Sequence, residues 1–437
     1  MHLRQLTIPL LTLLPLLAAA GGAQTPERHA AATAAVAGTA GEEPAAADTV
    51  IVVDKVQVTA IKQGMVLRSQ PVAATIVGSR AIERERIGAL KHLSQQVPNF
   101  FAPDYGSRMT SSIYVRGLGA RIDQPVMGLN IDNVPVLNKD NYDTELADAE
   151  RIEVLRGPQS TLYGRNTMGG VINVYTLSPL SYEGVRLSAE YGSGDSYKFR
   201  ASSYYKLTPD LGMAVTGYYT HTGGFFENLA TGDKCDWERL GGGRWKTQWR
   251  NRTGLRIDNT LSFSVLEQGG YPYAYVGDDI IGDDGRPEHF GHLSRRADVR
   301  LAAVHRRRGG DDIIGDDGRP VVRRGEIRYN DPCSYRRTAL SDGLTIRYDA
   351  GNFTVASITC YQYSDDEMIL DQDFLPLSYF TLRQARTEHS VTEDLVFRSR
   401  GDKAYRWLLG AFGFYRHGTM NAPVHFKQTG IEELILK

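Results

Sequence analysis

The sequence predicts an exported chain in which a compact α+β domain precedes an antiparallel transmembrane β-barrel that is incomplete. Three observations indicate this fold class. The chain starts with a short apolar segment, continues with one helical pattern and four short strand-like runs between turn residues, and then alternates aromatic and small residues over many longer runs. With 437 residues it is too long for one ordinary domain.

Charge and cysteine content exclude several classes of protein. The formal net charge is -1, so the chain as a whole does not attract nucleic acid, and we expect no nucleic-acid partner. The three cysteines, Cys235, Cys333 and Cys360, have neither a CxxC spacing nor the density of a disulfide scaffold. We therefore expect no metal and no cofactor, while a bridge between Cys235 and Cys333 remains an open alternative.

Residues 1–23 have the pattern of a cleaved signal peptide. A short start with Arg4 leads into an apolar core over residues 6–17, and small residues follow over 18–23. The alternative is a membrane anchor, but a spanning helix needs about 20 apolar residues, and this core is shorter. We predict export.

Two further segments precede the α+β domain. Residues 24–47 are rich in alanine without an amphipathic period, which predicts a flexible linker. Residues 48–65 begin with Asp48 and continue with β-branched residues, the composition of an extended segment that could add to the sheet edge of another protein. An ordinary first strand of the domain is the alternative.

The α+β domain is expected within residues 54–178. Ser79 is a possible helix cap, and the helix is expected to end before Pro98. The strand-like runs are separated by Gly, Pro, Asn and Asp positions. The expected helix has its apolar face on Ile82, Ile87, Leu90 and Leu93, and the runs cover residues 111–121, 125–136, 149–157 and 169–176.

The segment LRGPQSTLYGRNTMGGVINVYT, residues 155–176, combines closely spaced glycines with a strand. Glycines permit positive φ and close backbone approach, so we expect consecutive tight turns that lead into the strand. The GLG at 117–119 is not a dinucleotide fingerprint, because Arg121 and Asp123 follow where a third glycine and a helix are required.

The motifs IYVRGLGAR, LNIDNVPV and AERIEVLRGPQSTLYGRNTMGGVINVYT occur in this order. In this respect the chain resembles the plug domain of TonB-dependent outer-membrane receptors. The resemblance covers residues 48–178 and implies a TonB box at 48–53 and a plug domain at 54–178.

Residues 179–437 are expected to form a partial outer-membrane barrel of roughly nine strands. Aromatic and small residues alternate, and brief turns such as LTPD, DAGN and RGDKAY contrast with a long polar loop after THTGG. Barrels need such alternation because lipid faces one side of each strand and the lumen faces the other. A soluble β-sandwich is the alternative.

Plugged transporter barrels have about 22 strands, and the chain ends in GIEELILK without an aromatic-terminated final strand. We therefore expect a truncated reading of a longer receptor. A 437-residue chain that alone formed a heat-modifiable, protease-resistant barrel would contradict this expectation.

Residues 277–328 are anomalous. GDDIIGDDGRP occurs at 277–287 and again at 310–320, and the stretch 291–328 holds ten Arg and no Lys. A duplication or a frame error is the first interpretation. Calcium binding by the Asp pairs or attraction of lipopolysaccharide by the Arg run are alternatives, although the histidines nearby lack a metal-ligand frame.

The resemblance implies active transport of a scarce solute across the bacterial outer membrane by a monomeric barrel. The expected partners are TonB with its inner-membrane energising complex, a small-molecule chelate, and outer-membrane lipid with lipopolysaccharide. A ferric siderophore is the first expectation, and cobalamin, haem or oligosaccharide are alternatives. A secreted adhesin is a rival class, whereas an enzyme is not expected, since no catalytic motif occurs.

The resemblance also implies site residues. In the family, plug arginines meet barrel glutamates, so Arg116 and Arg156 are expected to pair with Glu393, exposed surface charges being the alternative. The residues expected to contact TonB are Asp48, Thr49, Val50, Ile51, Val52 and Val53.

Ligand contacts are expected from aromatic and charged side chains in loops, which can stack on a solute or pair with its charge. Core packing is the alternative for the two phenylalanines of the plug. The candidates are Phe100, Phe101, Tyr105, Arg108, Tyr271 and Tyr273, with Phe225, Phe226 and Tyr275 in the outer loops.

Overall fold

A computed structural model describes most of the chain beyond its first 56 residues. Contacts divide the chain into residues 1–54 and 55–437, and every described residue lies in the second unit. The described residues are 57–58, 65–66, 72–103, 112–119, 125–143, 145–146, 148–274, 279–281, 287–289, 313–314, 320–322, 325–401 and 405–435.

Residues 72–178 form the predicted α+β domain, which we call the plug. Its main sheet has five strands, and every neighbouring pair is antiparallel except the parallel pair β10–β7. In spatial order the strands are β3 (Ala73–Gly78), β9 (Ala149–Arg156), β10 (Gly170–Thr176), β7 (Met127–Ile131) and β8 (Val134–Val136).

The predicted single helix is wrong in its extent. The structure has α1 (Ser79–Arg84) and a separate 3-10 helix η2 (Leu90–Gln95). Arg86 between them has a φ of 52°, which an α-helix cannot contain. Gly78 rather than Ser79 is the cap residue. The apolar face is nevertheless the predicted one, because Ile82, Ile87, Leu90 and Leu93 are all buried.

Two of the four predicted strand-like runs fold back on themselves as hairpins. Asp132 and Asn133 have φ of 51° and 71°, which suits a two-residue hairpin turn between β7 and β8. Arg116 and Gly117 turn the chain in the same way in a small sheet. That sheet consists of β4 (Phe100–Phe101), β5 (Tyr114–Val115) and β6 (Leu118–Gly119).

The glycine-rich segment forms tight turns, as predicted. A one-turn helix α2 (Ser160–Tyr163) is ended by Gly164, whose φ is 69°. At Gly170 a Cβ would lie 2.2 Å from the carbonyl oxygen of Leu155, so only glycine permits the close approach of β10 to β9.

The core of the plug lies between its main sheet and its helical segments. Leu93, Met127, Ile152, Val154 and Ile172 have no exposed surface. Burial of such side chains is the main favourable term in folding, so the plug has an apolar core of its own.

Strands between residues 184 and 426 form a large antiparallel sheet in which successive strands of the sheet pair in space. The predicted number of roughly nine strands is confirmed, with the short β24 as a tenth. The strands are β11 (Gly184–Gly192), β12 (Ser196–Thr208), β13 (Leu211–Thr222), β14 (Glu238–Arg250), β15 (Leu255–Gln268), β20 (Ser334–Asp349), β21 (Phe353–Asp371), β22 (Phe380–Ser399), β23 (Leu408–Asn421) and β24 (Val424–Phe426).

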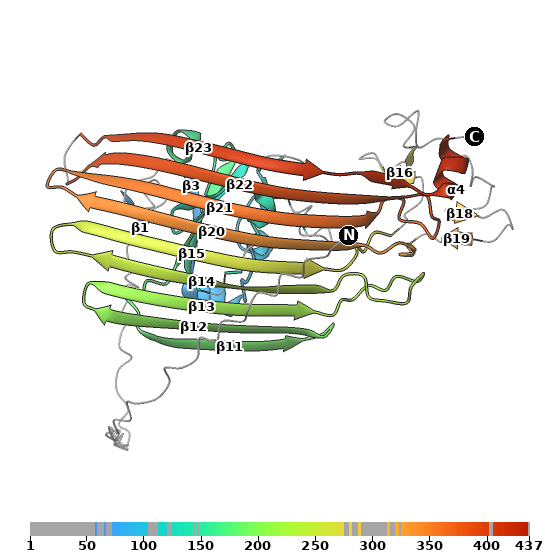
Figure 1. Cartoon of the computed structure of the whole chain (residues 1–437). Helices are drawn as coiled ribbons and strands as arrows, with labels where there is room; N and C mark the ends of the chain where they lie inside the picture. The colour runs from blue at the N-terminus through green and yellow to red at the C-terminus, as the bar shows by residue number, and fades with distance from the viewer. Residues whose placement is uncertain are drawn as a thin grey trace, which may run out of the picture. The chain divides into compact units, whose positions relative to one another are not determined.

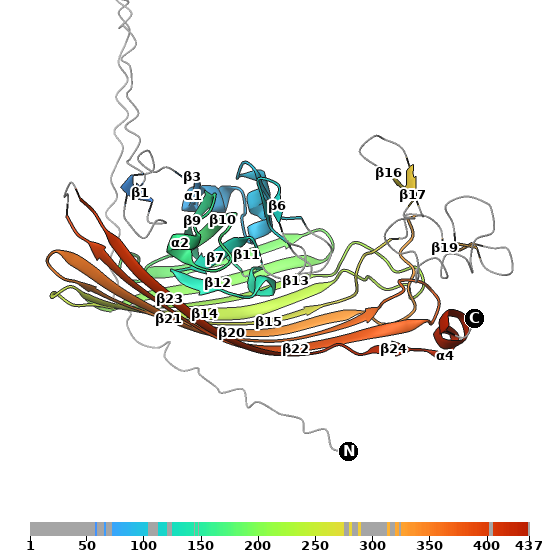
Figure 2. The ribbon, with the colours of Figure 1, turned by 90° about the horizontal axis from the view of Figure 1, so that it is seen from above.

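The large sheet is curved, and the plug lies on its concave side (Figures 1 and 2). Among the described strands, β11 and β23 stand at opposite edges and are not paired with each other. The described sheet is therefore a wall around one side of the plug.

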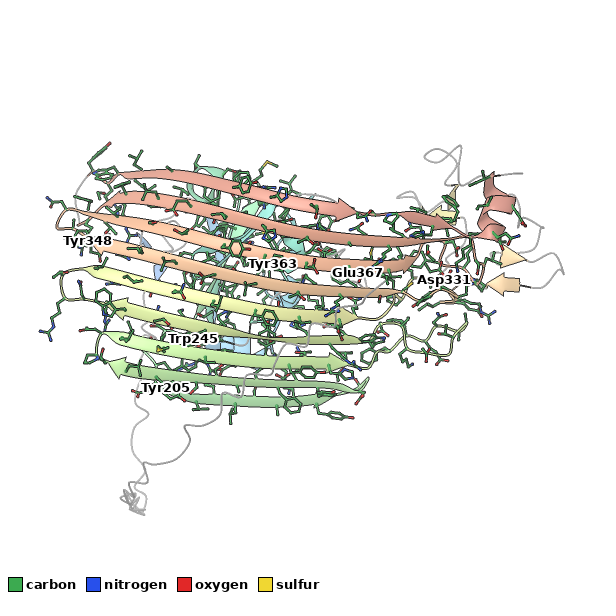
Figure 3. The ribbon with its side chains drawn as sticks, in the orientation of Figure 1. Tyr205, Trp245, Asp331, Tyr348, Tyr363 and Glu367 are labelled. Atoms are coloured by element: carbon green, nitrogen blue, oxygen red, sulfur yellow. The ribbon has the colours of Figure 1, made fainter. Side chains whose placement is uncertain are left out.

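The two faces of the large sheet differ in chemistry. Tyr205, Trp245 and Tyr348 are exposed on the convex face (Figure 3). Arg244 and Lys246, the neighbours of Trp245 in β14, are buried on the concave face. This alternation is the pattern predicted for a sheet with lipid on one side and a polar lumen on the other.

The two longest connections lie at the same end of the large sheet. Connections 209–210, 251–254, 350–352 and 400–407 join strands at one end, and connections 193–195, 223–237, 269–333 and 372–379 lie at the other. We call these the short-turn end and the long-loop end.

Minor elements complete the described chain. Each copy of the repeated sequence contributes to a two-stranded sheet, β16 (Asp279–Ile281) with β17 (Pro287–His289), and β18 (Ile313–Ile314) with β19 (Pro320–Val322). The others are β1 (Gln57–Val58), β2 (Met65–Val66), η4 (Lys139–Asn141), α4 (Gln428–Gly430) and the π-helical η5 (Ile431–Ile435). Within the described part of the chain, no helix is long and apolar enough to cross a membrane.

Candidate functional site

The boundary between the plug and the large sheet is joined by charged side chains. In each of five ion pairs across this boundary, the plug supplies the carboxylate and the concave face of the sheet supplies the cation. The pairs are Glu83–Arg186, Asp132–Lys246, Asp140–Arg386, Glu145–Arg200 and Asp148–Arg244.

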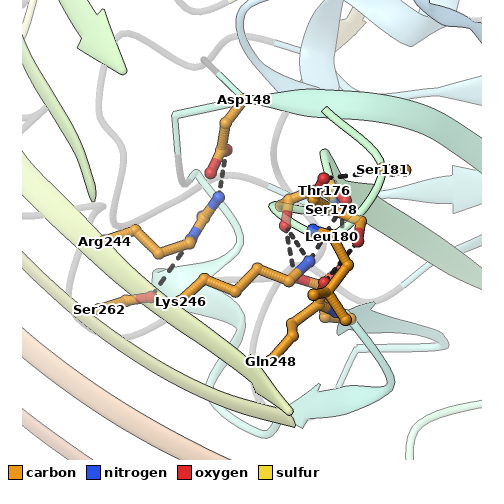
Figure 4. Close-up of polar contacts among 10 residues, drawn as sticks. Asp148, Thr176, Ser178, Leu180, Ser181, Arg244, Lys246, Gln248 and Ser262 are labelled. Atoms are coloured by element: carbon orange, nitrogen blue, oxygen red, sulfur yellow. Dashed lines mark hydrogen bonds and ion pairs between the residues drawn. The ribbon is translucent and has the colours of Figure 1, made fainter. Parts of the chain in front are cut away.

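Asp132 and Lys246 form the most completely hydrogen-bonded of these pairs. Figure 4 shows Lys246 together with Thr176, which takes part in the same group of hydrogen bonds. The Lys246 ammonium donates to Asp132 Oδ2 at 3.0 Å and to Thr176 Oγ1 at 2.7 Å, and Thr176 Oγ1 donates to Asp132 Oδ2 at 2.6 Å. Burial alone would raise the pKa of Asp132, but the charge of Lys246 and the hydrogen bonds from Thr176 outweigh it and lower that pKa. Asp132 is thus held ionised.

Asp148 and Arg244 form a second buried pair, which Figure 4 also shows. Only 7% of each side chain is exposed, and Arg244 Nε also donates to Ser262 Oγ at 3.3 Å. Because β9 follows Asp148 directly, this pair ties the central strands of the plug to β14. Removal of either partner would leave a buried charge uncompensated.

The hairpin β7–β8 is held by a third group of contacts. Gln362 in β21 donates to the Pro135 carbonyl at 2.7 Å and accepts from the Leu137 amide at 3.1 Å. Val134 packs against Ile358 and Cys360 of the same strand. The hairpin is therefore held to the wall both by hydrogen bonds of its backbone and by packing of its side chains.

Asp140, just beyond this hairpin, pairs with Arg386 in β22. Arg386 also donates to Asp366 in β21 at 3.0 Å, so one guanidinium joins a plug carboxylate and a sheet carboxylate. Such a bridge fixes the lateral position of the plug on the wall.

The predicted ion pairs of Arg116 and Arg156 with Glu393 are wrong. Arg156 instead donates within the plug, to the Pro98 carbonyl at 2.7 Å and to Thr75 Oγ1 at 3.1 Å. Glu393 accepts from Ser357 Oγ and Thr359 Oγ1 on the neighbouring strand, both at 2.6 Å. Arg116 is exposed in the turn between β5 and β6.

The physical reason is strand parity. In β22 the even-numbered residues, among them Arg386 and Glu388, face the plug, and the odd-numbered Glu393 lies on the other set. Alternation in the sequence separates the odd-numbered from the even-numbered residues of a strand, but it does not show which set faces the plug. The prediction placed Glu393 in the set that faces the plug, and the structure places it in the other.

The predicted ligand contacts divide into buried and exposed residues. Phe100 is 4% exposed and belongs to the plug core, whereas Phe101 is 57% exposed. Tyr271 is 2% exposed, and Tyr273, which is less buried, packs against it and against Phe374. In this structure Phe100 and Tyr271 are packing residues, and the roles of Phe101 and Tyr273 stay predictions.

Several predicted residues lie outside the described part of the chain. They are Asp48, Thr49, Val50, Ile51, Val52, Val53, Tyr105, Arg108 and Tyr275. The other two loop candidates, Phe225 and Phe226, are 57% and 53% exposed near the long-loop end. Among the residues that the structure describes, no group of His, Cys, Asp and Glu is arranged to hold a metal ion.

The sequence interpretation missed the charged residues at the boundary. One signal for them exists in GGGRWKTQWR, residues 241–250. With Trp245 facing lipid, period-2 alternation puts Arg244 and Lys246 on the inner face, where a cation needs a carboxylate partner. No comparable signal identifies which plug carboxylates meet them.

The fold and this boundary define a class of protein: an outer-membrane protein whose plug is held by ion pairs against the inner face of a lipid-facing sheet. Residues 66–171 match the family model described as TonB-dependent Receptor Plug Domain. Residues 66–171 are therefore a plug domain of the TonB-dependent receptor type, as the motifs indicated, and the predicted location in the bacterial outer membrane is confirmed.

Relatives with curated names match about a third of the chain. The pesticin receptor of Yersinia pestis is 33% identical over 144 residues, which cover 32% of this chain and 21% of the receptor. The vitamin B12 transporter BtuB of Vibrio vulnificus is 27% identical over 183 residues, which cover 39% of this chain and 28% of the transporter.

Solved structures share the fold over a greater length. The ferric yersiniabactin uptake receptor FyuA of Yersinia pestis has a TM-score of 0.64 at 21% identity, covering 81% of this chain and 50% of that one. The ferripyoverdine receptor of the outer membrane of Pseudomonas aeruginosa has a TM-score of 0.60 at 12% identity, covering 84% and 45%. The chain thus spans about half the length of these receptors.

Proposed function

We propose that this protein takes up an iron chelate of the ferric siderophore class across the outer membrane, driven by TonB. The observation that carries the proposal is the seating of the plug, which has its own apolar core and meets the wall through ion pairs. A domain held in this way obstructs a lumen and can be displaced by force. The names of relatives, among them the ferric yersiniabactin uptake receptor, favour an iron chelate.

Force enters the plug at its first strand. The proposed TonB contact, residues 48–53, precedes β3 in the chain, and β3 is an edge strand of the plug sheet, paired only with β9 in that sheet. The segment 48–53, in an extended conformation, would add as a strand to the edge of a β-sheet in TonB through backbone hydrogen bonds. A pull on this tether therefore loads β3 first and then β9, which follows the Asp148–Arg244 pair.

The proposed solute arrives at the long-loop end, where aromatic side chains are exposed. Phe225 and Phe226 are exposed in connection 223–237, and the half-buried Tyr273 lies in connection 269–333. Aromatic rings can stack on the planar ligand groups of a chelate. We further propose that the protein is a monomeric barrel in contact with lipopolysaccharide, that it is not an enzyme, and that the solute is its only small-molecule partner.

The decisive experiment removes residues 48–53 from the full chain. Binding of radioactive ferric chelate to outer membranes should persist while energy-dependent uptake is lost. Deletion of six residues within the linker, 30–35, is the matched control and should leave uptake intact. Unchanged uptake without residues 48–53 would contradict TonB coupling, and binding without uptake by the intact chain would favour an adhesin.

Cobalamin is the second candidate solute, because the chain matches the vitamin B12 transporter BtuB over 183 residues. Growth of a deletion strain on a panel of ferric chelates and cobalamin distinguishes the two. Loss of growth on one ferric chelate alone is the expected result. Loss on cobalamin alone would overturn the iron assignment and retain the transport mechanism.

A further inference from the structure

A cavity lies between the plug and the wall, beneath the hairpin β7–β8 and against β14, β15, β20 and β21. Apolar side chains from the hairpin form one side, and the wall contributes polar residues together with apolar ones such as Phe263 and Ala339. Its lining includes Val134, Val136, Arg244, Ser264, Arg337 and Ser341.

Arg337 is the unusual residue of this cavity. It is only 3% exposed, yet its Nε and Nη1 atoms have no hydrogen-bond partner. The other arginine in the lining, Arg244, is paired with Asp148 and Ser262. A buried guanidinium with unused donors is costly unless something else occupies them.

The neighbours of Arg337 in the sheet do not use these donors. Asp366 lies directly opposite Arg337 across β20–β21, and Arg386 lies directly opposite Asp366 across β21–β22. Asp366 makes its ion pair with Arg386, and no ion pair of Arg337 occurs among the described residues. The guanidinium of Arg337 therefore remains available to a ligand.

A second buried polar group without a hydrogen-bond partner, the hydroxyl of Tyr335, indicates a path that leads to this cavity. Tyr335, two residues earlier on the same face of β20, is 1% exposed and its hydroxyl has no hydrogen-bond partner. Because β20 begins at the long-loop end, a solute that enters there passes Tyr335 before Arg337. Around Tyr335 lie Leu240, Leu266 and Met368, which form an apolar cluster on the inner face.

We infer that the cavity is an anion subsite in which Arg337 binds a carboxylate, or another anionic oxygen group, of the solute as it passes the plug. The inference rests on the proposed uptake function. A ferric chelate with three dianionic ligand groups has a net negative charge, since these exceed the charge of Fe³⁺. Arginine is suited to such a group because its planar fork donates two parallel hydrogen bonds.

Chemical modification tests the subsite without transport. Phenylglyoxal reacts with accessible guanidinium groups, and mass spectrometry of the purified full chain reports the rate at Arg337. Citrate at constant ionic strength should slow this rate several-fold relative to chloride and leave the rate at the exposed Arg336 unchanged. Equal rates in both salts, or no modification of Arg337 in either, would overturn the inference.

Measurements of chelate uptake test the role of Arg337 in transport. Arg337→Gln should retain chelate binding at the cell surface and lower the uptake rate about tenfold, and Arg337→Lys should restore part of it. Arg336→Gln is the matched control, because Arg336 is adjacent and exposed on the opposite face. Each variant is judged to fold if its amount in the outer membrane and the protease accessibility of its plug equal those of the unchanged chain. Unchanged uptake by Arg337→Gln would overturn the inference.

A double variant excludes the simplest rival role. If Arg337 only neutralises Asp366, then Arg337→Gln with Asp366→Asn recovers uptake, and the inference is overturned. If the double variant stays as slow as Arg337→Gln, an anion subsite is supported. Failure of the intact chain to take up any iron chelate would remove the proposed function, whereas protection of Arg337 by citrate would still establish the subsite.

Discussion

The interior of the plug and its boundary with the large sheet are built from opposite chemistry. Inside the plug, Ile152 and Ile172 on adjacent strands have no exposed surface. At the boundary, Asp148 meets Arg244 and Asp132 meets Lys246. Apolar burial holds the plug together, and paired charges with a few packed side chains such as Val134 hold it to the wall.

This difference bears on how each region can be separated. Exposure of an apolar core to water is opposed at every step, at about 25 cal/mol per Å² of buried surface. Ion pairs, once water enters, exchange protein partners for solvent, and a well-hydrated pair is worth only about 0 to 1 kcal/mol. We expect the boundary to be the region that yields under force when water can enter it.

The largest expected effect is the loss of one buried partner at the boundary. Asp148→Ala leaves the buried Arg244 without its carboxylate and should weaken plug seating by about 3 to 5 kcal/mol. Protease accessibility of the plug in the full chain measures seating. Asp233→Ala, at an exposed loop position, is the control and should have no effect. Equal protection of Asp148→Ala and the intact chain would show that the pair does not seat the plug.

Acid should weaken the boundary in a smaller step. The pKa of Asp132 in the folded chain lies below its ordinary value of 3.8. The ionised Asp132 therefore contributes fully to plug seating above pH 3.8, and this contribution is lost as the pH falls through the lower pKa of the folded chain. Plug accessibility should rise in that range. The slope should be reduced in Asp132→Asn, and an identical slope in both proteins would assign the acid effect to other carboxylates.

A core substitution tests the other side of the comparison. Ile152→Val removes one methylene from a fully buried site in β9 and should cost about 0.5 to 1.5 kcal/mol. Hydrogen exchange in β9 and β10 should quicken, while contacts at the boundary keep their protection. Loosening of both regions together would mean that plug and wall unfold as one unit.

The smallest effect is expected at the exposed end of the boundary. Glu83 and Arg186 have 61% and 37% of their side chains exposed, so Glu83→Gln should change seating by about 0 to 1 kcal/mol. High salt should abolish even this difference, because surface charges are screened. A large effect that persists in high salt would place Glu83 in the same category as Asp148.

Much of the fold was predictable because it depends on local pattern. The alternation over residues 179–437 predicted strands, and the large sheet begins in that region with β11 and continues through neighbouring antiparallel strands. The helix expected from Ser79 to a point before Pro98 and the strand-like run 125–136 were misjudged because each contains positive φ at a residue other than glycine, at Arg86 and at Asp132 with Asn133. Such conformations leave a weaker trace in sequence than glycine does.

Less of the site was predictable. The family resemblance implied that Arg116 and Arg156 of the plug pair with Glu393 of the barrel, whereas the structure uses plug carboxylates and sheet cations. Arg156 is engaged within the plug by Pro98 and Thr75, which are distant in sequence. Pairing between residues 55 to 246 positions apart in the sequence depends on the register and curvature of the wall, which no short motif contains.

Composition and alternation by themselves determined that this chain has a glycine-punctuated α+β domain followed by a two-faced sheet, because turn geometry and the two-residue period of a strand are local properties. Tertiary structure alone decided which charges meet and which guanidinium, that of Arg337, is left with unused donors. The reason is that electrostatic partnership depends on distance and burial in space, and these follow only from the packing of segments remote in sequence.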